Sequence, residues 1–109
     1  TDCLAYAGIN APNGTLLRED IMVEDGVAKL TDRSAFGGSI ATFDMLIRTS
    51  LKAGLPLLDI IKMSTMTPAR IMGIEKQTGS LETGKEADVI IFDQNINMHA
   101  VFVKGSRIL

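Results

Sequence analysis

Hydrophobic and polar positions follow different patterns in successive parts of the chain. Residues 1–14 mix small residues with Gly, Pro and Asn, which is typical of an irregular loop. Residues 15–30 are extended, with the apolar runs 21–23 and 27–30 on either side of Glu24-Asp25-Gly26. Asp-Gly between two apolar runs predicts a β-hairpin.

Helical periodicity begins after Ser39, and Gly54 and Pro56 end this first helix. Positions spaced by three and four residues share one helix face. The apolar face is formed by Phe43, Leu46, Ile47 and Leu51, and the solvated stripe by Asp44, Arg48 and Lys52.

Two shorter helices are predicted next. The second covers about residues 57–65 and buries Leu57, Leu58 and Ile61, together with Met63 or Met66. In the third, Thr67 is the expected N-cap, Pro68 the first helical residue and Gly73 the stop. The methionines of the helical region are expected to fill the core: Met45, Met63, Met66 and Met72.

The remainder of the chain reads as strands. Residues 87–93 form a continuous apolar strand, 98–103 form the next, and the turn 104–106 leads into a third segment, 107–109. The predicted order is therefore a hairpin, three helices and a β-meander, which is an α+β arrangement within this chain.

Composition limits the classes of function. The 109 residues, 46% of them hydrophobic and 22% charged, are typical of a soluble globular protein large enough to bury a core. A net charge of -2 argues against a nucleic-acid partner, and no apolar run is long enough to cross a membrane. The single cysteine, Cys3, excludes an internal disulfide, fits a cytoplasmic location, and is expected to be small and buried.

One stretch has the spacing of a nucleotide-binding motif. Gly79 to Lys85 has the spacing G-x-x-x-x-G-K of a P-loop, but Glu86 stands where the motif needs a Ser or Thr hydroxyl for magnesium. A P-loop also opens a helix, whereas these residues precede the apolar run 89–92. The stretch is predicted to be a pair of turns that leads into a strand.

Other candidate groups are few. His99 is the only histidine, so it is interpreted as a half-exposed strand residue and not as a zinc ligand. Asp2 is either a solvated carboxylate or a group at the end of a strand. Residues 36–39, FGGS, are predicted to form a loop whose glycines let backbone N–H groups approach an anion or a sugar, although a plain N-cap at Ser39 is the alternative.

Several stretches resemble a known group of enzymes. TPARIMGIEKQTGSLETGKEADVIIFD, residues 67–93, resembles the C-terminal signature of the amidohydrolase superfamily. Thr1-Asp2, Ala7-Gly8, the hairpin and the GGS and TFD stretches are similar to the N-acetylglucosamine-6-phosphate deacetylases of that superfamily. The resemblance covers the whole chain, but only about the last third of such an enzyme.

The resemblance implies a fold and a set of site residues. The chain would be the C-terminal end of a metal-dependent hydrolase (β/α)8 barrel, residues 1–73, plus part of its small β-sandwich domain, residues 74–109. Asp2 would be the catalytic acid and base. The substrate-binding loop of the family aligns with Phe36, Gly37, Gly38 and Ser39, with Phe36 in place of the usual leucine.

The implied reaction is deacetylation of N-acetylglucosamine 6-phosphate, a phosphosugar of amino-sugar metabolism. A divalent metal of the zinc or iron type polarises the acetyl carbonyl in the full-length enzymes, while Asp2 would move the proton. The metal ligands of the family lie upstream, so this chain is expected to bind no metal and to be inactive alone. The absence of an initial methionine also fits an excerpt.

The resemblance has a consequence for assembly. The small β-domain of the family is built from both ends of the chain, so strands in 87–109 would have open edges and form a homo-oligomer. Two alternatives stay open. One is another amidohydrolase, dihydroorotase-like or deaminase-like, and the other is a non-catalytic α+β module for binding or assembly.

Overall fold

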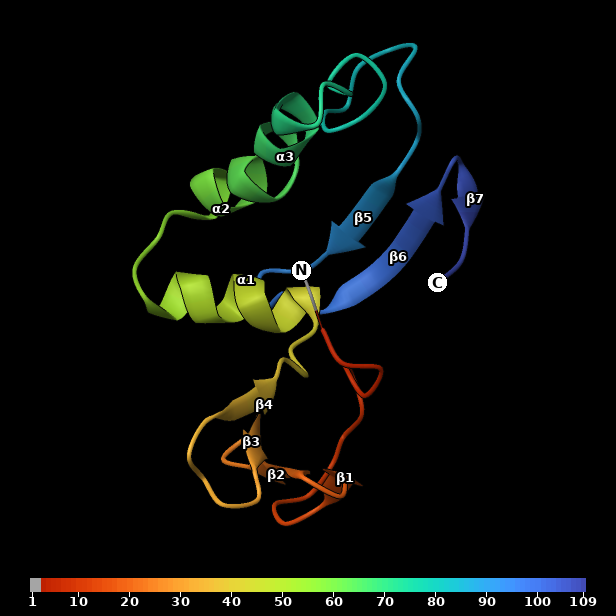
Figure 1. Ribbon diagram of the computed structural model, residues 1–109. Helices are drawn as coiled ribbons and strands as arrows, with labels where there is room; N and C mark the ends of the chain where they lie inside the picture. The colour runs from red at the N-terminus through yellow and green to blue at the C-terminus, as the bar shows by residue number, and fades with distance from the viewer. Residues whose placement is uncertain (1–2) are drawn as a thin grey trace. The chain divides into compact units, whose positions relative to one another are not determined.

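The computed structural model of the protein describes residues 3–109 and shows a mixed α/β chain with two sheets. The residues group into two compact units, one ending at Leu46 and the other comprising Ile47–Leu109. The division expected at residue 73 concerns a larger enzyme and stays a prediction. The elements, labelled in Figure 1, are β1 Leu16–Arg18, β2 Ile21–Glu24, β3 Val27–Leu30, β4 Phe36–Gly38, α1 Phe43–Lys52, α2 Leu57–Ser64, α3 Met66–Ile71, β5 Val89–Phe92, β6 Met98–Val103 and β7 Ser106–Arg107.

The first unit is built on a four-stranded antiparallel sheet in the order β1-β2-β3-β4. The predicted hairpin is confirmed: Glu24 pairs with Val27, and Asp25 and Gly26 form the turn with φ values of 55° and 74°. Positive φ at both turn residues matches the right-handed twist of the two strands. The sheet buries Leu17, Ile21, Val23 and Ala28.

The segment before β1 is irregular, as predicted, and its apolar side chains cover the sheet core. Leu4, Tyr6 and Ala11 pack against the buried cluster, together with Leu30 and Ile40. Cys3 is exposed, so the expectation that it is buried was wrong. Its neighbour Leu4 takes the place against the core.

The predicted first helix is confirmed as α1, with Gly54 after its end at φ 88°. Ile47, 4% exposed, is the buried residue of its apolar face. The stripe expected to be solvated is only partly so. Arg48 donates from Nε to the carbonyl of Asn95 at 3.2 Å and from Nη2 to the carbonyl of Ile96 at 2.7 Å.

Helices α2 and α3 differ from the sequence-based expectation in what they bury. Ile60 of α2 is the buried residue, 4% exposed, because it is the one that faces Ile47 and Ile96. Ile61 is half-buried. The expected core residues that instead lie exposed are Leu57, Leu58, Met63 and Met72, with Met45 of α1.

The start of α3 lies earlier than predicted. Thr65 and not Thr67 holds the N-cap position, and its side chain makes no cap hydrogen bond, because Oγ1 donates to the carbonyl of Ile61. Pro68 is tolerated as the third residue because N–H groups of the first turn need no helical partner. Gly73, at φ 70°, ends the helix as predicted.

The three-stranded meander β5-β6-β7 is confirmed as an antiparallel sheet. The turn between β5 and β6 contains Ile96, which is 1% exposed and has φ 62°. Asp93 supports this turn: its Oδ1 accepts the N–H groups of Asn95 at 2.8 Å and Asn97 at 2.9 Å. The core of the unit consists of Ile47, Ile60 and Ile96, covered by Leu51, Phe92 and Met98.

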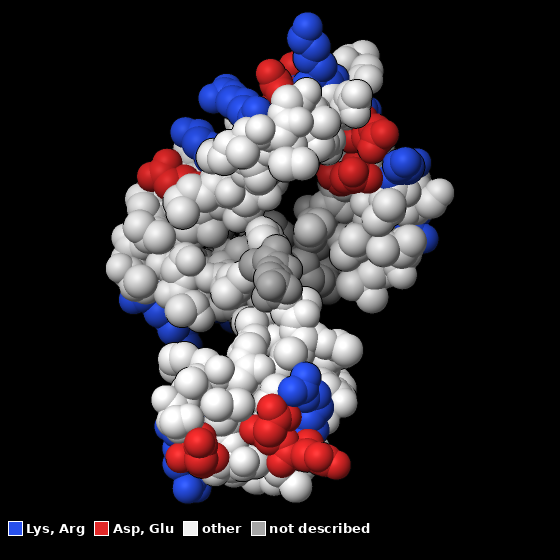
Figure 2. All heavy atoms as spheres, viewed as in Figure 1, with Lys and Arg blue, Asp and Glu red and all other residues white. Residues whose placement is uncertain are grey.

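The surface carries charges of both signs. In Figure 2 acidic and basic side chains are interspersed over the visible face. No helix among residues 3–109 is long and apolar enough to cross a membrane.

Candidate functional site

The predicted sugar-contacting residues lie at the edge of the first sheet. Asp2, the predicted acid and base, lies outside the described residues. Phe36, Gly37 and Gly38 were expected in a loop, but they form strand β4, because Phe36 pairs with Lys29 and Gly38 with Ala28 across an irregular register. The Phe36 side chain is 75% exposed and is therefore accessible to a ligand.

The two glycines of β4 are required by packing within the unit. A Cβ at Gly37 would lie 2.9 Å from Cγ2 of Ile21, and one at Gly38 would lie 2.9 Å from Cγ of Leu4. Gly38 also has φ 122°, which side-chain-bearing residues rarely adopt. The glycines therefore allow β4 to approach apolar side chains closely, in addition to any role toward a ligand.

Ser39 connects this edge to the start of the described chain. Its carbonyl accepts the N–H of Leu4 at 2.7 Å, and its Oγ accepts the N–H of Ala41 at 3.2 Å. Ser39 is not the N-cap of α1, because that helix begins at Phe43. This backbone hydrogen bond places Leu4 beside the end of β4.

The P-loop-like stretch is a structural turn, as predicted. Gly79 and Gly84 have φ values of 95° and 92°, and the chain continues into β5 without a helix. Lys85 donates to Ser80 Oγ at 2.6 Å and to Glu82 Oε1 at 3.1 Å. Hydrogen bonds from the Ser80 hydroxyl, and then from Lys85, lower the pKa of the Glu82 carboxyl. The lysine thus neutralises a carboxylate of its own turn.

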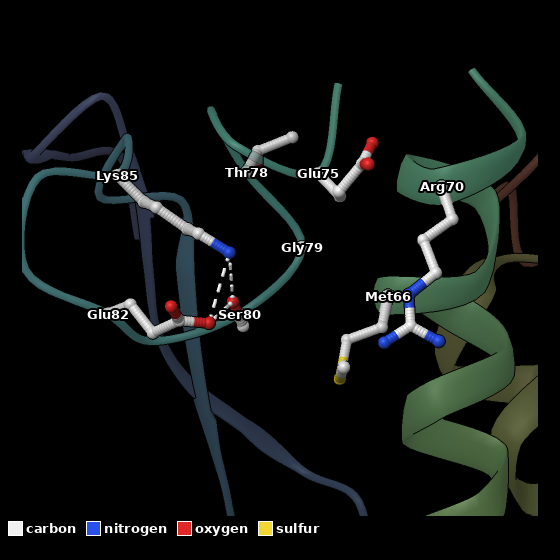
Figure 3. A pocket seen from close by; sticks show the side chains of 8 residues that line it. All are labelled: Met66, Arg70, Glu75, Thr78, Gly79, Ser80, Glu82 and Lys85. Atoms are coloured by element: carbon white, nitrogen blue, oxygen red, sulfur yellow. Dashed lines mark hydrogen bonds and ion pairs between the residues drawn. The ribbon is translucent and has the colours of Figure 1, made fainter. Parts of the chain in front are cut away.

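A small pocket of about 100 Å³ lies between α3 and this turn. In Figure 3 Arg70 and Met66 of α3 face Ser80 and Lys85 across it. Pockets for small ligands usually measure about 300–1,000 Å³. The pocket is therefore too small for a phosphosugar.

A second hollow, of about 520 Å³, lies beside the turn between β1 and β2. Arg18, Glu19 and Asp20 line it, and all three are exposed. A region lined by one exposed turn does not enclose a ligand. It is open surface.

Most of the carboxylates with a lowered pKa lie in or beside the turns of the two sheets. At the first hairpin, hydrogen bonds from Arg33 and then Lys29 lower the pKa of Glu24 below its usual 4.5. Lys29 Nζ lies 3.0 Å from Glu24 Oε2 and 2.9 Å from Asp25 Oδ2. These groups are paired with their neighbours and hold the hairpin, so they do not form a catalytic pair.

His99 lies on the surface, with its side chain 59% exposed and Nε2 3.6 Å from Asp93 Oδ2. The backbone and then the side-chain hydrogen bonds from Asn97 are the main cause of the lowered pKa of Asp93. Within residues 3–109, no three His, Cys, Asp or Glu side chains come together as metal ligands. His99 is thus half-exposed, as expected.

The chain is similar in sequence to known proteins along nearly its whole length. Its sequence matches the Amidohydrolase family over residues 6–108. It is 28% identical over 109 residues to the N-acetylglucosamine-6-phosphate deacetylase of Mus musculus, a match that covers 99% of this chain and 27% of the mouse protein. It is also 28% identical over 106 residues to the N-acetylgalactosamine-6-phosphate deacetylase of Escherichia coli O157:H7, covering 96% of this chain and 28% of that protein.

The fold agrees with a solved relative. The crystal structure of N-acetylglucosamine-6-phosphate deacetylase from Pasteurella multocida superposes with a TM-score of 0.83 and 26% identity, over 98% of this chain and 28% of that chain. The chain therefore spans 27% or 28% of the length of these relatives.

Proposed function

Because the chain belongs to the amidohydrolase family, we propose that it forms part of a deacetylase that converts N-acetylglucosamine 6-phosphate to glucosamine 6-phosphate and acetate. The observation that carries this proposal is the end-to-end match to proteins named for that reaction, in sequence over 99% of the chain and in fold over 98%. Members of the superfamily with other reactions share the TPAR and GKEAD stretches, so these alone do not favour one substrate.

The reaction is hydrolysis of an amide. Water adds to the acetyl carbonyl carbon, the C–N bond breaks, and the sugar nitrogen leaves with one additional proton. In the proposal Asp2 accepts a proton from the water and returns it to the leaving nitrogen. Positioned proton transfer of this kind accelerates reactions by about 10²–10⁴-fold.

A metal is also implied for the whole enzyme, because the family resemblance includes a divalent ion of the zinc or iron type. The residues described here do not fit such an ion, since no group of potential ligands in residues 3–109 could hold one. We therefore assign no metal ligand to them. The part of the chemistry proposed for this chain is proton transfer and substrate contact.

We propose that the edge at β4 contacts the sugar. The exposed ring of Phe36 offers an apolar face, and Ser39 has a hydroxyl proton that remains able to donate while its oxygen accepts from Ala41. Gly37 and Gly38 position these two residues through their close packing on Ile21 and Leu4.

The same proposal includes the place of this chain in the whole enzyme. Residues 1–73 would complete a (β/α)8 barrel and residues 74–109 a small β-domain in a cytoplasmic enzyme of amino-sugar metabolism. The free edge of β5 would pair with a strand that residues 3–109 do not provide. In the isolated chain the same edge would produce a homo-oligomer.

The test is acetate release from N-acetylglucosamine 6-phosphate. We expect turnover from the native polypeptide purified from its source cells and none from the 109-residue chain alone. Asp2→Asn in the active polypeptide should lower kcat by about 10²–10⁴-fold. The C4 epimer, N-acetylgalactosamine 6-phosphate, and a dihydroorotase substrate serve as comparison substrates.

Two results would contradict the proposal. Turnover of the isolated chain would show that it holds a complete site. A native polypeptide that carries this chain but hydrolyses only the dihydroorotase substrate would assign it to another branch of the superfamily.

A further inference from the structure

Phe36 is the most exposed aromatic side chain among the described residues. It is 75% exposed, whereas Phe43 is 42% exposed and the other aromatic residues are half-buried. An apolar ring gains free energy when a ligand or another apolar surface removes it from water. The surroundings of this ring therefore indicate what it can bind.

Strand pairing places the Phe36 ring on the outer face of the first sheet. Phe36 pairs with Lys29 of β3, and directly paired residues have their side chains on the same face. Ala28, the neighbour of Lys29 in β3, is buried in the core of the unit, so its side chain lies on the opposite face. The ring is thus directed away from the core.

The end of β4 leaves room for a flat ligand beside this ring. β4 is an edge strand, and the two residues that follow Phe36 are Gly37 and Gly38, which have no side chains. Ser39 comes next, and its hydroxyl proton can donate while its oxygen accepts from a backbone N–H. An exposed ring, open backbone and one donor together suit a sugar ring that lies flat on the aromatic face.

Overall similarity does not choose between two epimeric sugars. The Mus musculus relative is named for N-acetylglucosamine 6-phosphate and the Escherichia coli O157:H7 relative for N-acetylgalactosamine 6-phosphate, and each is 28% identical to this chain. The two sugars differ only in the orientation of the hydroxyl at C4. A preference for one of them must therefore come from single residues that contact the sugar ring.

The two epimers offer different surfaces to an aromatic side chain. In the glucosamine ring the hydroxyl groups at C3 and C4 are equatorial, and the ring C–H hydrogens alternate between the two faces. In the galactosamine ring the hydroxyl at C4 is axial, so the hydrogens on C3, C4 and C5 lie together on one face. This continuous apolar face matches the flat ring of a phenylalanine, whose negative π face attracts the positive ends of C–H bonds.

We infer that Phe36 is a specificity-determining residue, whose ring stacks on the apolar face of the galacto-configured sugar and makes N-acetylgalactosamine 6-phosphate a substrate of this site. Leucine, the usual residue at this position in the family that the chain resembles, is branched and has no π face. This inference rests on the proposed function, because it takes the β4 edge as the part of the site that contacts the sugar.

The experiment measures the preference for the two epimers in the native polypeptide that carries this chain. The variants are Phe36→Leu, which removes the aromatic ring, and Phe36→Tyr, which retains it. Leu16→Ala is the matched control, because Leu16 is also exposed, at 64%, on the opposite edge strand of the same sheet. The kcat/KM for acetate release from both N-acetyl sugars and the Tm are measured for each protein.

We expect the parent to hydrolyse both epimers. Phe36→Leu should lower the ratio of kcat/KM for the galacto epimer to that for the gluco epimer by about 2–10-fold, the size of one aromatic contact. Phe36→Tyr should keep the ratio, and Leu16→Ala should not change it. A parent that does not hydrolyse the galacto epimer would overturn the inference. An unchanged ratio in Phe36→Leu would also overturn it, and a lower Tm in that variant would then assign the ring to packing.

Binding of the deacetylated sugars separates this inference from the proposed function. Isothermal titration calorimetry gives the Kd of glucosamine 6-phosphate and of galactosamine 6-phosphate, whether or not the protein releases acetate. A protein that releases no acetate, but loses its preference for galactosamine 6-phosphate in Phe36→Leu, would support the inference and contradict the function. A protein that releases acetate from N-acetylglucosamine 6-phosphate, with the same epimer preference in the parent and in Phe36→Leu, would do the reverse.

Discussion

Single glycines at β4 show how close packing determines residue identity. Gly38→Ala adds a Cβ 2.9 Å from Leu4 Cγ at a residue with φ 122°. We expect a loss of about 2–4 kcal/mol from backbone strain and overpacking together. Urea unfolding of the variant and the parent chain measures this loss.

Gly14→Ala is the control for strain alone. Gly14 has φ 86°, but a Cβ added there would meet no other atom within 4 Å. Its substitution should cost about 1–2 kcal/mol, because an L-residue is strained in the left-handed conformation. If both variants lose the same stability, the contact with Leu4 does not restrict residue 38.

The folding stability of the first unit depends on pH through the Glu24 carboxyl. Its folded-state pKa lies below 4.5 because Arg33 and Lys29 donate to the carboxylate, so the unfolded chain binds the proton more readily. The stability that Glu24 contributes is therefore present above about pH 4.5 and is lost as pH falls through the lower folded-state value. Thermal melts between pH 7 and pH 3 should show this decline.

Glu24→Gln should flatten part of that decline, because the variant has no carboxylate to protonate at this hairpin. Glu19→Gln, in the exposed turn before β2, removes a carboxylate of equal charge that lies apart from the Arg33 and Lys29 contacts. An identical acid response of Glu24→Gln and the parent chain would show that the hairpin ion pairs do not contribute to stability.

At the scale of elements, Arg48 connects α1 to the turn between β5 and β6. It donates to the carbonyls of Asn95 and Ile96, and Ile96 is itself 1% exposed. Arg48→Met keeps much of the apolar stem but removes these donors, which should destabilise the second unit by about 1–3 kcal/mol.

Lys52→Met is the matched variant on the same helix, because Lys52 is exposed. Substitutions at such surface positions usually change stability by no more than about 0.5 kcal/mol. Denaturant unfolding, followed by circular dichroism, distinguishes the two. Equal stability of both variants would mean that the two carbonyls are satisfied as well by water.

At the scale of the whole molecule, we expect the edge strand β5 to control association of the isolated chain. Ile90 and Ile91 are neighbours on opposite faces of this strand, and 48% and 51% of their surfaces are exposed. An exposed apolar edge strand is a template for pairing with another strand. We expect light scattering to show a dimer or larger oligomer whose fraction rises with concentration.

Ile91→Lys should shift the chain toward monomer, because a lysine on an edge strand opposes pairing. Leu16→Lys is the comparison, since Leu16 is 64% exposed on β1, an edge strand of the other sheet. A monomeric parent chain, or an equal effect of both lysines, would exclude β5 as the associating edge.

Local patterns in the sequence determined most of the elements. Asp25-Gly26 specified the hairpin because a two-residue turn with positive φ matches the strand twist, and Gly54 and Gly73 marked helix ends for the same conformational reason. The P-loop-like stretch could be recognised as a turn because Glu86 and the following strand are incompatible with phosphate binding. Amidohydrolase membership was also readable from the residues in 67–93, and the family match confirms it.

Only the tertiary structure decided which side chains are covered. The periodicity of α2 shows which residues share a face, but not whether a partner lies against that face. Of the residues of α2, only Ile60 is buried, while Leu58 is exposed. The periodicity of α1 predicted that Arg48 is solvated. Its hydrogen-bond partners, Asn95 and Ile96, lie 47 and 48 positions further along the chain, so no local pattern could show them. Local propensity acts over a few residues, whereas burial and long-range hydrogen bonds depend on what the fold brings together.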